Sequence, residues 1–206
     1  MQQPLRQNTK AALMSAAERL IAEKGLGGVS VREITKAAGA RNESALQYHF
    51  GSMEDLIREV FARRYREIDQ SRLELLEKMD ADDVNDDLDR LLEAAIRPLL
   101  LSCQDVEGRL YARFSAQLTA DPRFDMVDLV RSIGLDSVRA LGERIGNCIA
   151  DLPDSIRETR LRRLLPLSAL IMADYARQIE AGMALPVELA IREAKSSMAG
   201  FLRAPV

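Results

Sequence analysis

Residues 29–52 read VSVREITKAAGARNESALQYHFGS, and this stretch decides the fold. Ser30 is followed three residues later by Glu33, a capping box that predicts the start of a helix, and Gly39 ends that helix after about two turns. Asn42 can cap another short helix, which runs to the next glycine. Two short helices joined by a glycine turn are the arrangement of a helix-turn-helix.

Helical periodicity continues on both sides of this stretch. Upstream, apolar residues recur at helical spacing from Asn8 or Thr9 to Lys24, where a glycine follows and ends the helix. Downstream, Ser52 together with Asp55 marks the start of a long helix with an apolar stripe. The helix-turn-helix is therefore flanked by two longer helices.

The rest of the chain also shows helix signals and no strand signals. Pro98 and Pro166 fall inside helical patterns, and we expect each to kink or split its helix. The fold class is therefore all-α, with a helix-turn-helix domain in residues 1–51, a connecting helix at about 52–79 and a second helical domain in residues 80–206. Beyond the connecting helix, we expect helices at about 85–101, 105–119, 125–150, 154–181 and 186–203.

Charge is distributed unevenly along the chain. The formal net charge of the 206 residues is −3, which by itself does not suit a DNA-binding protein. Residues 1–51, however, contain seven Lys and Arg against four Glu, a net charge of +3, so the remainder carries −6. A basic segment on an acidic body suits a protein that presents one end to phosphate.

Several classes of protein are disfavoured by the sequence. No apolar run reaches the ~18 residues that cross a bilayer, and the N-terminus lacks the apolar core of a secretion signal. Cys103 and Cys148 have neither metal-ligand nor disulfide spacing, so we expect two reduced, packed thiols in the cytosol. The acidic stretch 80–89 lacks a calcium-loop pattern and is interpreted as a solvated linker and a negatively charged helix start, which the helix dipole favours. No motif indicates an enzyme, and we expect no catalytic residue, metal or cofactor.

The N-terminal motifs resemble those of the TetR family of bacterial repressors. The resemblance covers about residues 9–60 and is carried by residues 23–25, 29–35, 38–39 and 46–52. The chain differs from the common family pattern by one extra residue before Leu46, by Gln47 in place of an aromatic residue and by Met53 in place of a frequent Lys. The resemblance implies a DNA-binding first domain and a variable helical domain that binds an inducer and forms a four-helix dimer interface.

The resemblance also assigns DNA contacts to the first domain. Thr9 and Ser30 stand at helix starts, where hydroxyls and backbone N–H groups can hold phosphate. Arg41 can read guanine and Gln47 adenine, while the two residues after Gln47 would bond phosphate. Plainer roles stay open: Ser30 as a helix cap, His49 as a local hydrogen-bonding group and Arg41 as a solvated charge. The full set of candidates is Thr9, Ser30, Arg41, Asn42, Ser44, Ala45, Gln47, Tyr48 and His49.

The second domain has more chain than a dimer interface needs. About 50 residues would supply a four-helix interface, so we expect residues 85–150 to enclose a largely apolar pocket for a small molecule. Arg113 suggests an acidic or carbonyl-bearing ligand, but it can equally pair with an Asp or Glu of a neighbouring helix. The candidate ligand-binding residues are Tyr111, Arg113, Gln117, Met172 and Tyr175.

The sequence therefore predicts a dimeric transcriptional repressor that binds an operator in double-stranded DNA and is released by a small-molecule inducer. The apolar-striped helices after Pro153 and Pro186 are expected to form the homodimer interface. Three alternatives stay open: a constitutive regulator without an inducer, an activator, and a helical protein-interaction adaptor. No membrane partner is expected.

Overall fold

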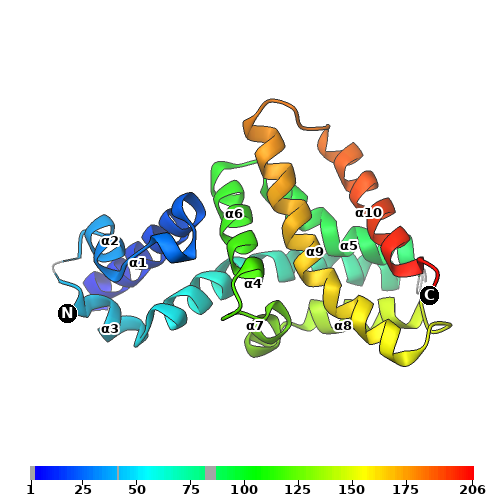
Figure 1. The fold of residues 1–206 in the computed structure, drawn as a ribbon, viewed down its shortest axis with the longest axis horizontal. Coiled ribbons are helices and arrows are strands. Elements are labelled where there is room, and N and C mark those ends of the chain that lie inside the picture. Colours follow the sequence, from blue (N-terminus) through cyan, green and yellow to red (C-terminus); the bar gives the residue numbers. More distant parts are fainter. Residues whose placement is uncertain (1–2, 41, 82–86) are drawn as a thin grey trace.

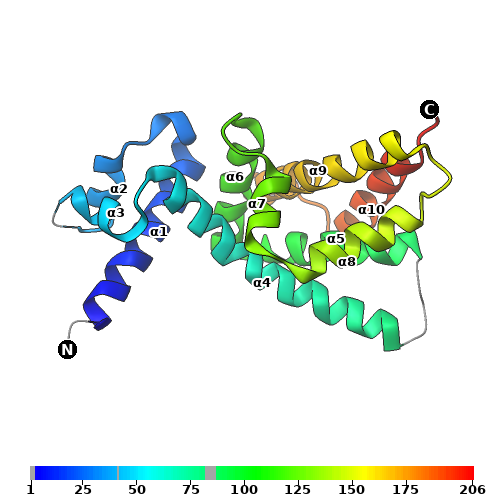
Figure 2. The same cartoon turned by 90° about the horizontal axis from the view of Figure 1, so that it is seen from below.

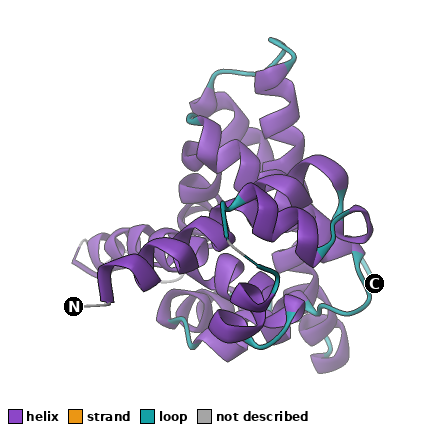
Figure 3. Cartoon of the chain, turned by 90° about the vertical axis from the view of Figure 1, so that its left-hand side faces the viewer, coloured by secondary structure: helices purple, strands orange, loops and turns teal. Residues whose placement is uncertain are grey.

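The computed structural model describes residues 3–40, 42–81 and 87–206, with side chains from Thr9 onward. These residues form helices joined by short connections and contain no strand (Figure 3), which confirms the all-α prediction. In chain order the elements are α1 (Gln3–Lys24), the 3-10 turn η1 (Leu26–Gly28), α2 (Val31–Ala37), α3 (Ser44–Phe50), α4 (Met53–Ala81), α5 (Leu88–Ser102), α6 (Val106–Ala120), α7 (Met126–Ile133), α8 (Asp136–Asn147), α9 (Asp154–Glu180) and α10 (Val187–Arg203).

Helices α1 to α3 form a small head at one end of the molecule (Figure 1). Leu13 and Ile21 of α1, Ile34 of α2 and Leu46 of α3 are all buried and contribute to a common core. Helices α2 and α3 have only seven residues each, too few to be stable in isolation. Packing against α1 and the start of α4 therefore holds them in place.

Helix α4 joins the head to the rest of the chain as one continuous element (Figure 2). Its start is fixed as predicted, because Ser52 Oγ accepts the Asp55 N–H at 3.0 Å. Near its N-terminus it packs against α1 and α3, where Phe61 is fully buried. Further along it packs against α5, α7 and α8, where Leu76 is buried. One helix thus contributes to the cores of both regions.

Helices α5 to α10 form the body. Helix α6 packs against α9 on one side and against α1 of the head on another, while α10 lies along α5. Phe61, Tyr111 and Phe114 lie one after another where head and body meet, with successive ring centroids 6.4 and 6.2 Å apart. The apolar core is continuous from the head into the body.

An ionic cluster, which we call the joint, fastens the head to the body. It consists of Glu18 of α1, Arg63 and Arg64 of α4, and Glu107 of α6. The Glu18 carboxylate is only 4% exposed and accepts hydrogen bonds from Arg63 at 2.8 Å and from Arg64 at 3.0 Å. Arg64 also donates to Glu107 at 2.9 Å. Burial disfavours the charged form of Arg64, but the bonds to Glu107 and Glu18 raise its pKa overall.

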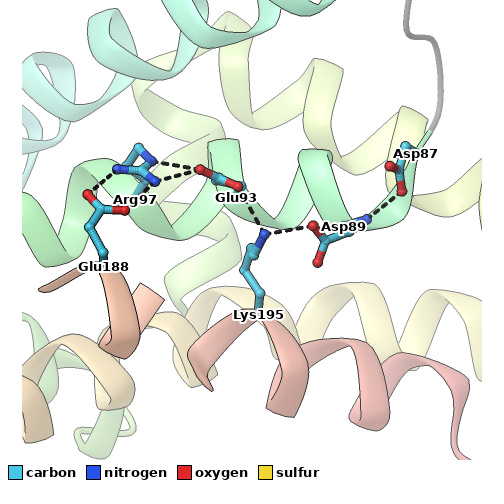
Figure 4. A network of polar contacts seen from close by, with 6 residues as sticks. All are labelled: Asp87, Asp89, Glu93, Arg97, Glu188 and Lys195. Carbon is cyan, nitrogen blue, oxygen red and sulfur yellow. Dashed lines mark hydrogen bonds and ion pairs between the residues drawn. The ribbon is translucent and has the colours of Figure 1, made fainter. Parts of the chain in front are cut away.

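A second ionic cluster, which we call the clamp, fastens α10 to α5 (Figure 4). It consists of Asp89, Glu93 and Arg97 of α5 with Glu188 and Lys195 of α10. Lys195 Nζ lies 2.7 Å from Asp89 Oδ2 and 2.9 Å from Glu93 Oε2. Arg97 donates to both Glu93 and Glu188. Burial would raise the pKa of Glu93, but hydrogen bonds from Lys195 and Arg97 lower it below its usual 4.5.

Two predicted helix bounds are wrong. The first helix begins at Gln3, several residues before the predicted start. The single helix expected at 125–150 is two helices, α7 and α8, because Gly134 adopts a left-handed conformation with φ 69° and ends α7. After this break, the N–H and hydroxyl of Ser137 at the start of α8 both donate to Asp69 of α4.

Neither proline splits its helix, contrary to part of the prediction. Helix α5 continues through Pro98 and α9 through Pro166. The side chain of Arg72 donates to the Ala95 carbonyl, which lies in the turn of α5 that Pro98 interrupts. The carbonyl that the missing N–H of Pro98 leaves without a helical donor is that of Ala94, so Arg72 serves the neighbouring carbonyl and packing keeps the helix continuous.

The acidic stretch and the two thiols can be compared with their predicted roles. Part of the stretch, residues 82–86, lies outside the described residues. Asp87 is the N-cap of α5 and Asp89 lies in its first turn, which confirms the predicted acidic helix start. Asp80 also pairs with Arg144 at 2.8 Å, which the linker interpretation did not anticipate. Within the described residues, Cys103 and Cys148 are thiols and form no disulfide; Cys103 is buried and Cys148 is half-buried. Burial raises the pKa of the Cys103 thiol to about 12.

Candidate DNA-binding surface

A capping box fixes the start of α2, as predicted. Ser30 Oγ accepts the Glu33 N–H at 3.3 Å, and Glu33 Oε2 accepts the N–H and the hydroxyl of Ser30, both at 2.9 Å. Lys24 Nζ lies 2.8 Å from the same carboxylate. Hydrogen bonds from Lys24 and Ser30 lower the pKa of Glu33 from 4.5 to about 2. The hydroxyl of Ser30 is therefore engaged as a helix cap, and its contact with phosphate stays a prediction.

A glycine turn sets the position of α3 relative to α2. Gly39 has φ 66°, a conformation that residues with a Cβ rarely adopt. The predicted start of α3 is wrong, because Asn42 is not its N-cap. The helix begins at Ser44, and Asn42 Oδ1 instead accepts the Ser44 hydroxyl at 2.6 Å.

Helix α3 buries one side chain and presents its neighbours to solvent. Leu46 is 2% exposed and anchors the helix in the core of the head. Gln47 is exposed and Tyr48 is 66% exposed, an unusual degree for an aromatic side chain. The Tyr48 ring meets the His49 ring edge-on, with centroids 5.1 Å apart. The side of α3 away from the core thus carries polar groups that another molecule can reach.

The remaining DNA-contact candidates are placed less uniformly. Asn42 and Ser44 are exposed, whereas Thr9, Ala45 and His49 are half-buried. Arg41, the predicted reader of guanine, lies outside the described residues. The structure therefore gathers most of the predicted set on and just before α3, and it does not place Arg41.

Two cations of the head were missed by the sequence reasoning. Arg32 and Lys36 of α2 are exposed, and within the described part of the chain neither forms an ion pair. Their spacing of four residues puts them on one side of α2 and could have identified them. Lys10, by contrast, pairs with Glu59 at 3.3 Å and lies 5.4 Å above the Phe50 ring. Arg32 and Lys36 are thus additional candidates for phosphate contacts.

The five predicted ligand-binding residues are not brought together in one place. Tyr111 is buried between head and body, and Gln117 lies against Gly25 at the same junction. Arg113 pairs with Glu180 of α9 at 2.5 Å, which is the structural alternative stated above. Met172 is buried, and the Tyr175 hydroxyl donates to the Leu185 carbonyl at 3.2 Å.

The body has several hollows, with volumes from about 200 to about 510 Å³, and the one of about 510 Å³ is bordered by Tyr175. A groove of about 400 Å³ between α4, α5 and α6 has a charged lining that includes Arg64, Lys78 and Arg97. An apolar cavity of about 200 Å³, partly open to solvent, is lined by residues of α4, α5 and α7 to α10. Of the five predicted residues only Tyr111 borders the groove, and none borders the apolar cavity.

Two negative findings apply to the described residues only. Within them, no group of His, Cys, Asp and Glu side chains could hold a metal ion. None of the helices described is both long and apolar enough to cross a membrane.

Comparison with known proteins finds a family model that matches the head and solved structures that have a similar fold. Residues 13–60 match the sequence model of the bacterial regulatory proteins of the tetR family. The fold is similar to that of a transcriptional regulator from Rhodococcus sp. Rha1, with a TM-score of 0.54 and 21% identity over 92% of this chain and 95% of that one. No curated protein matches the sequence.

Two further solved structures share this fold. One, from Rhodococcus sp., is described as a TetR-family transcriptional regulator and has a TM-score of 0.52 and 15% identity over 95% of this chain and 99% of its own. The other, described in the same way, is from Mesorhizobium loti MAFF303099 and has a TM-score of 0.52 and 17% identity over 96% of each chain. These identities support a common fold.

Proposed function

We propose that this chain is a TetR-family transcriptional regulator, and specifically a dimeric, cytoplasmic repressor that a small molecule releases from its operator. The match of residues 13–60 to the tetR family model supports this proposal. The DNA-binding domain would comprise residues 1–51, with α4 as the connection to a ligand-binding and dimerisation domain in residues 80–206. Double-stranded DNA, a second copy of the chain and an inducer are the partners.

The exposed side of α3 is the observation that carries the DNA-binding part of the proposal. A helix that enters the major groove must be slim and exposed, and α3 is anchored by Leu46 while Gln47 and Tyr48 project into solvent. Gln47 can form a bidentate bond with adenine, and Tyr48 can bond a phosphate. Arg32 and Lys36 on α2 would contact the backbone alongside.

The DNA-binding proposal is tested by fluorescence anisotropy with the DNA upstream of the gene that encodes the chain. Gln47→Ala and Arg41→Ala should each weaken specific binding by about 1–3 kcal/mol with little effect on non-specific DNA. Tyr48→Phe should weaken both kinds of binding. Arg139→Ala, on an exposed side chain of α8, is the control and should bind as the wild type does. Equal operator affinity for wild type and the α3 variants would contradict the assignment of α3.

An exposed apolar surface on α9 and α10 supports the dimer. Leu170 of α9 is 50% exposed, Leu189 of α10 is 40% exposed, and Leu185 in the connection between these helices is 42% exposed. Large apolar side chains gathered in this way are typical of a contact surface. Light scattering should give twice the 23.0 kDa of one chain. Leu170→Glu should shift the mass toward the monomer, because a two-fold interface contains each residue twice and the substitution would bury two uncompensated charges.

Release by a small molecule is the third part of the proposal. The groove and the apolar cavity of the body offer space, and a ligand that prefers one spread of the dimer need supply a coupling of only about 1–3 kcal/mol. By linkage, operator DNA must weaken ligand binding by the same factor. A ligand that binds the body and leaves operator affinity unchanged would indicate a constitutive regulator.

A further inference from the structure

The buried charges of the described residues differ in how they are neutralised. Glu18 and Lys195 form ion pairs in the joint and the clamp. Arg160 donates to the carbonyl of Leu202 in the last turn of α10, where the helix dipole is negative. Arg72 of α4 is only 2% exposed and has no ion pair within the described residues.

The neutral groups around Arg72 satisfy only part of its guanidinium. Nε and Nη2 donate to the Ala95 carbonyl at 3.1 and 2.7 Å, and Nη1 donates to the Tyr65 hydroxyl at 3.1 Å. The Tyr65 ring also lies 5.3 Å from the guanidinium carbon. Since a guanidinium has five N–H groups, two of them have no acceptor among the described residues.

Arg72 also lines the apolar cavity. The other walls of this cavity of about 200 Å³ are mainly aliphatic and come from α8, α9 and α10, for example Leu141, Leu164 and Met198. The second arginine of the lining, Arg162, has a side chain that is 48% exposed and pairs with Asp125 at 2.9 Å. The cavity thus has one buried cation without an ion pair among the residues that the structure describes, and its other cation is solvated and already paired.

The hydrogen bonds from position 72 to the Ala95 carbonyl of α5 do not require a charged donor. A neutral amide can donate to the Ala95 carbonyl, whereas a buried cation costs free energy unless an anion compensates it. An anion that enters the cavity would supply the missing partner, and the aliphatic walls would contact an apolar remainder.

We propose that the apolar cavity binds a compact carboxylate with an apolar body, whose carboxyl group is held by Arg72. A carboxylate of this kind would be the inducer, and that role rests on the proposed function. The cavity is smaller than a typical drug-sized pocket of ~300–1,000 Å³, which favours a short aliphatic or single-ring acid.

Calorimetry on the full-length protein tests the proposal with straight-chain acids from butanoate to octanoate, with benzoate, and with the neutral amide of each acid. At least one acid should bind at millimolar concentration or below, and its amide should bind at least about tenfold more weakly. Arg72→Gln, which keeps a neutral donor, should lower the affinity for the acid by about 10- to 100-fold. Arg162→Gln, in the same cavity, should change it by no more than about twofold.

Three results would overturn the proposal: no binding of any acid to the wild type, equal binding of acid and amide, or unchanged affinity in a folded Arg72→Gln variant. If Arg72→Gln does not fold, the comparison of acid and amide on the wild type still decides. Operator binding without ligand is measured on the same samples. If the wild-type protein binds operator DNA but none of the acids, this inference alone is refuted. If it binds an acid but no operator DNA, the proposed function is refuted and the acid site remains.

Discussion

The joint and the clamp are built from the same residue types but lie in different surroundings. In the joint the buried group is the Glu18 carboxylate, enclosed by two arginines between head and body. In the clamp the buried group is Lys195, whose partners Asp89 and Glu93 are 66% and 33% exposed. The stability of the joint therefore depends on complete neutralisation of a buried charge. In the clamp, the exposed carboxylates can bind water in place of Lys195.

The largest effect is expected for Glu18→Gln. The substitution leaves Arg63 and Arg64 facing each other without the carboxylate between them, and it should lower the free energy of unfolding by about 2–3 kcal/mol. This is below the ~3–5 kcal/mol of a fully buried pair, because Arg63 is 30% exposed. Urea unfolding measures the change. Glu107→Gln, at a side chain that is 73% exposed, is the matched control. An equal loss of unfolding free energy in this variant would contradict the claim that the burial of Glu18 causes the large effect.

A smaller effect is expected for Lys195→Met. The methionine keeps the apolar part of the side chain in place, and Asp89 and Glu93 can take water as a partner. The loss in the same urea experiment should be about 1 kcal/mol. A loss as large as that of Glu18→Gln would show that removing a charge from the clamp costs as much free energy of unfolding as removing one from the joint.

Acid should weaken the clamp through Glu93. Because the folded-state pKa of Glu93 is lowered below 4.5, its carboxylate contributes stability that is complete above about pH 4.5 and is lost as the pH falls through the folded-state pKa. Lys195→Met removes one cause of that lowering. The variant should therefore lose less stability than the wild type between about pH 5 and pH 3 in thermal unfolding. Parallel curves for the two proteins would argue against this role of Glu93.

The smallest effect is expected from salt. Raising NaCl from about 0.1 to 1 M shortens the Debye length from ~10 to ~3 Å and screens exposed pairs more than buried ones. The difference between wild type and Lys195→Met should shrink, while the difference for Glu18→Gln should persist. Equal salt dependence of the two differences would remove the distinction between joint and clamp.

Local signals in the sequence predicted the head better than the body. The capping box of Ser30 and Glu33 and the end of α1 at Lys24 depend on neighbouring residues, and both appear as predicted. The pairing of Glu18 with Arg64 joins residues 46 positions apart, so no local pattern reveals it. The break at Gly134 was missed, although a glycine followed closely by Asp136 is a signal of one helix ending and another beginning.

The same contrast applies to the candidate ligand site. Arg113 was proposed for its chemistry but pairs with Glu180 of a distant helix, which only the tertiary structure shows. Arg72 was overlooked, although a pattern marks it: it stands four residues after Ile68 and four before Leu76, within the buried stripe of α4. A charged residue at a position of the helical repeat that is otherwise apolar thus indicated a buried cation.

The continuity of α4 also restricts how the length of this chain can change. One residue inserted between Phe61 and Leu76 would turn everything beyond it by about 100° and advance it by about 1.5 Å. The buried side chains before the insertion would keep facing the head, while those after it would turn away from the body. Insertions and deletions should therefore be tolerated in the connection after α4 and be excluded within α4, unless they add or remove about two whole turns.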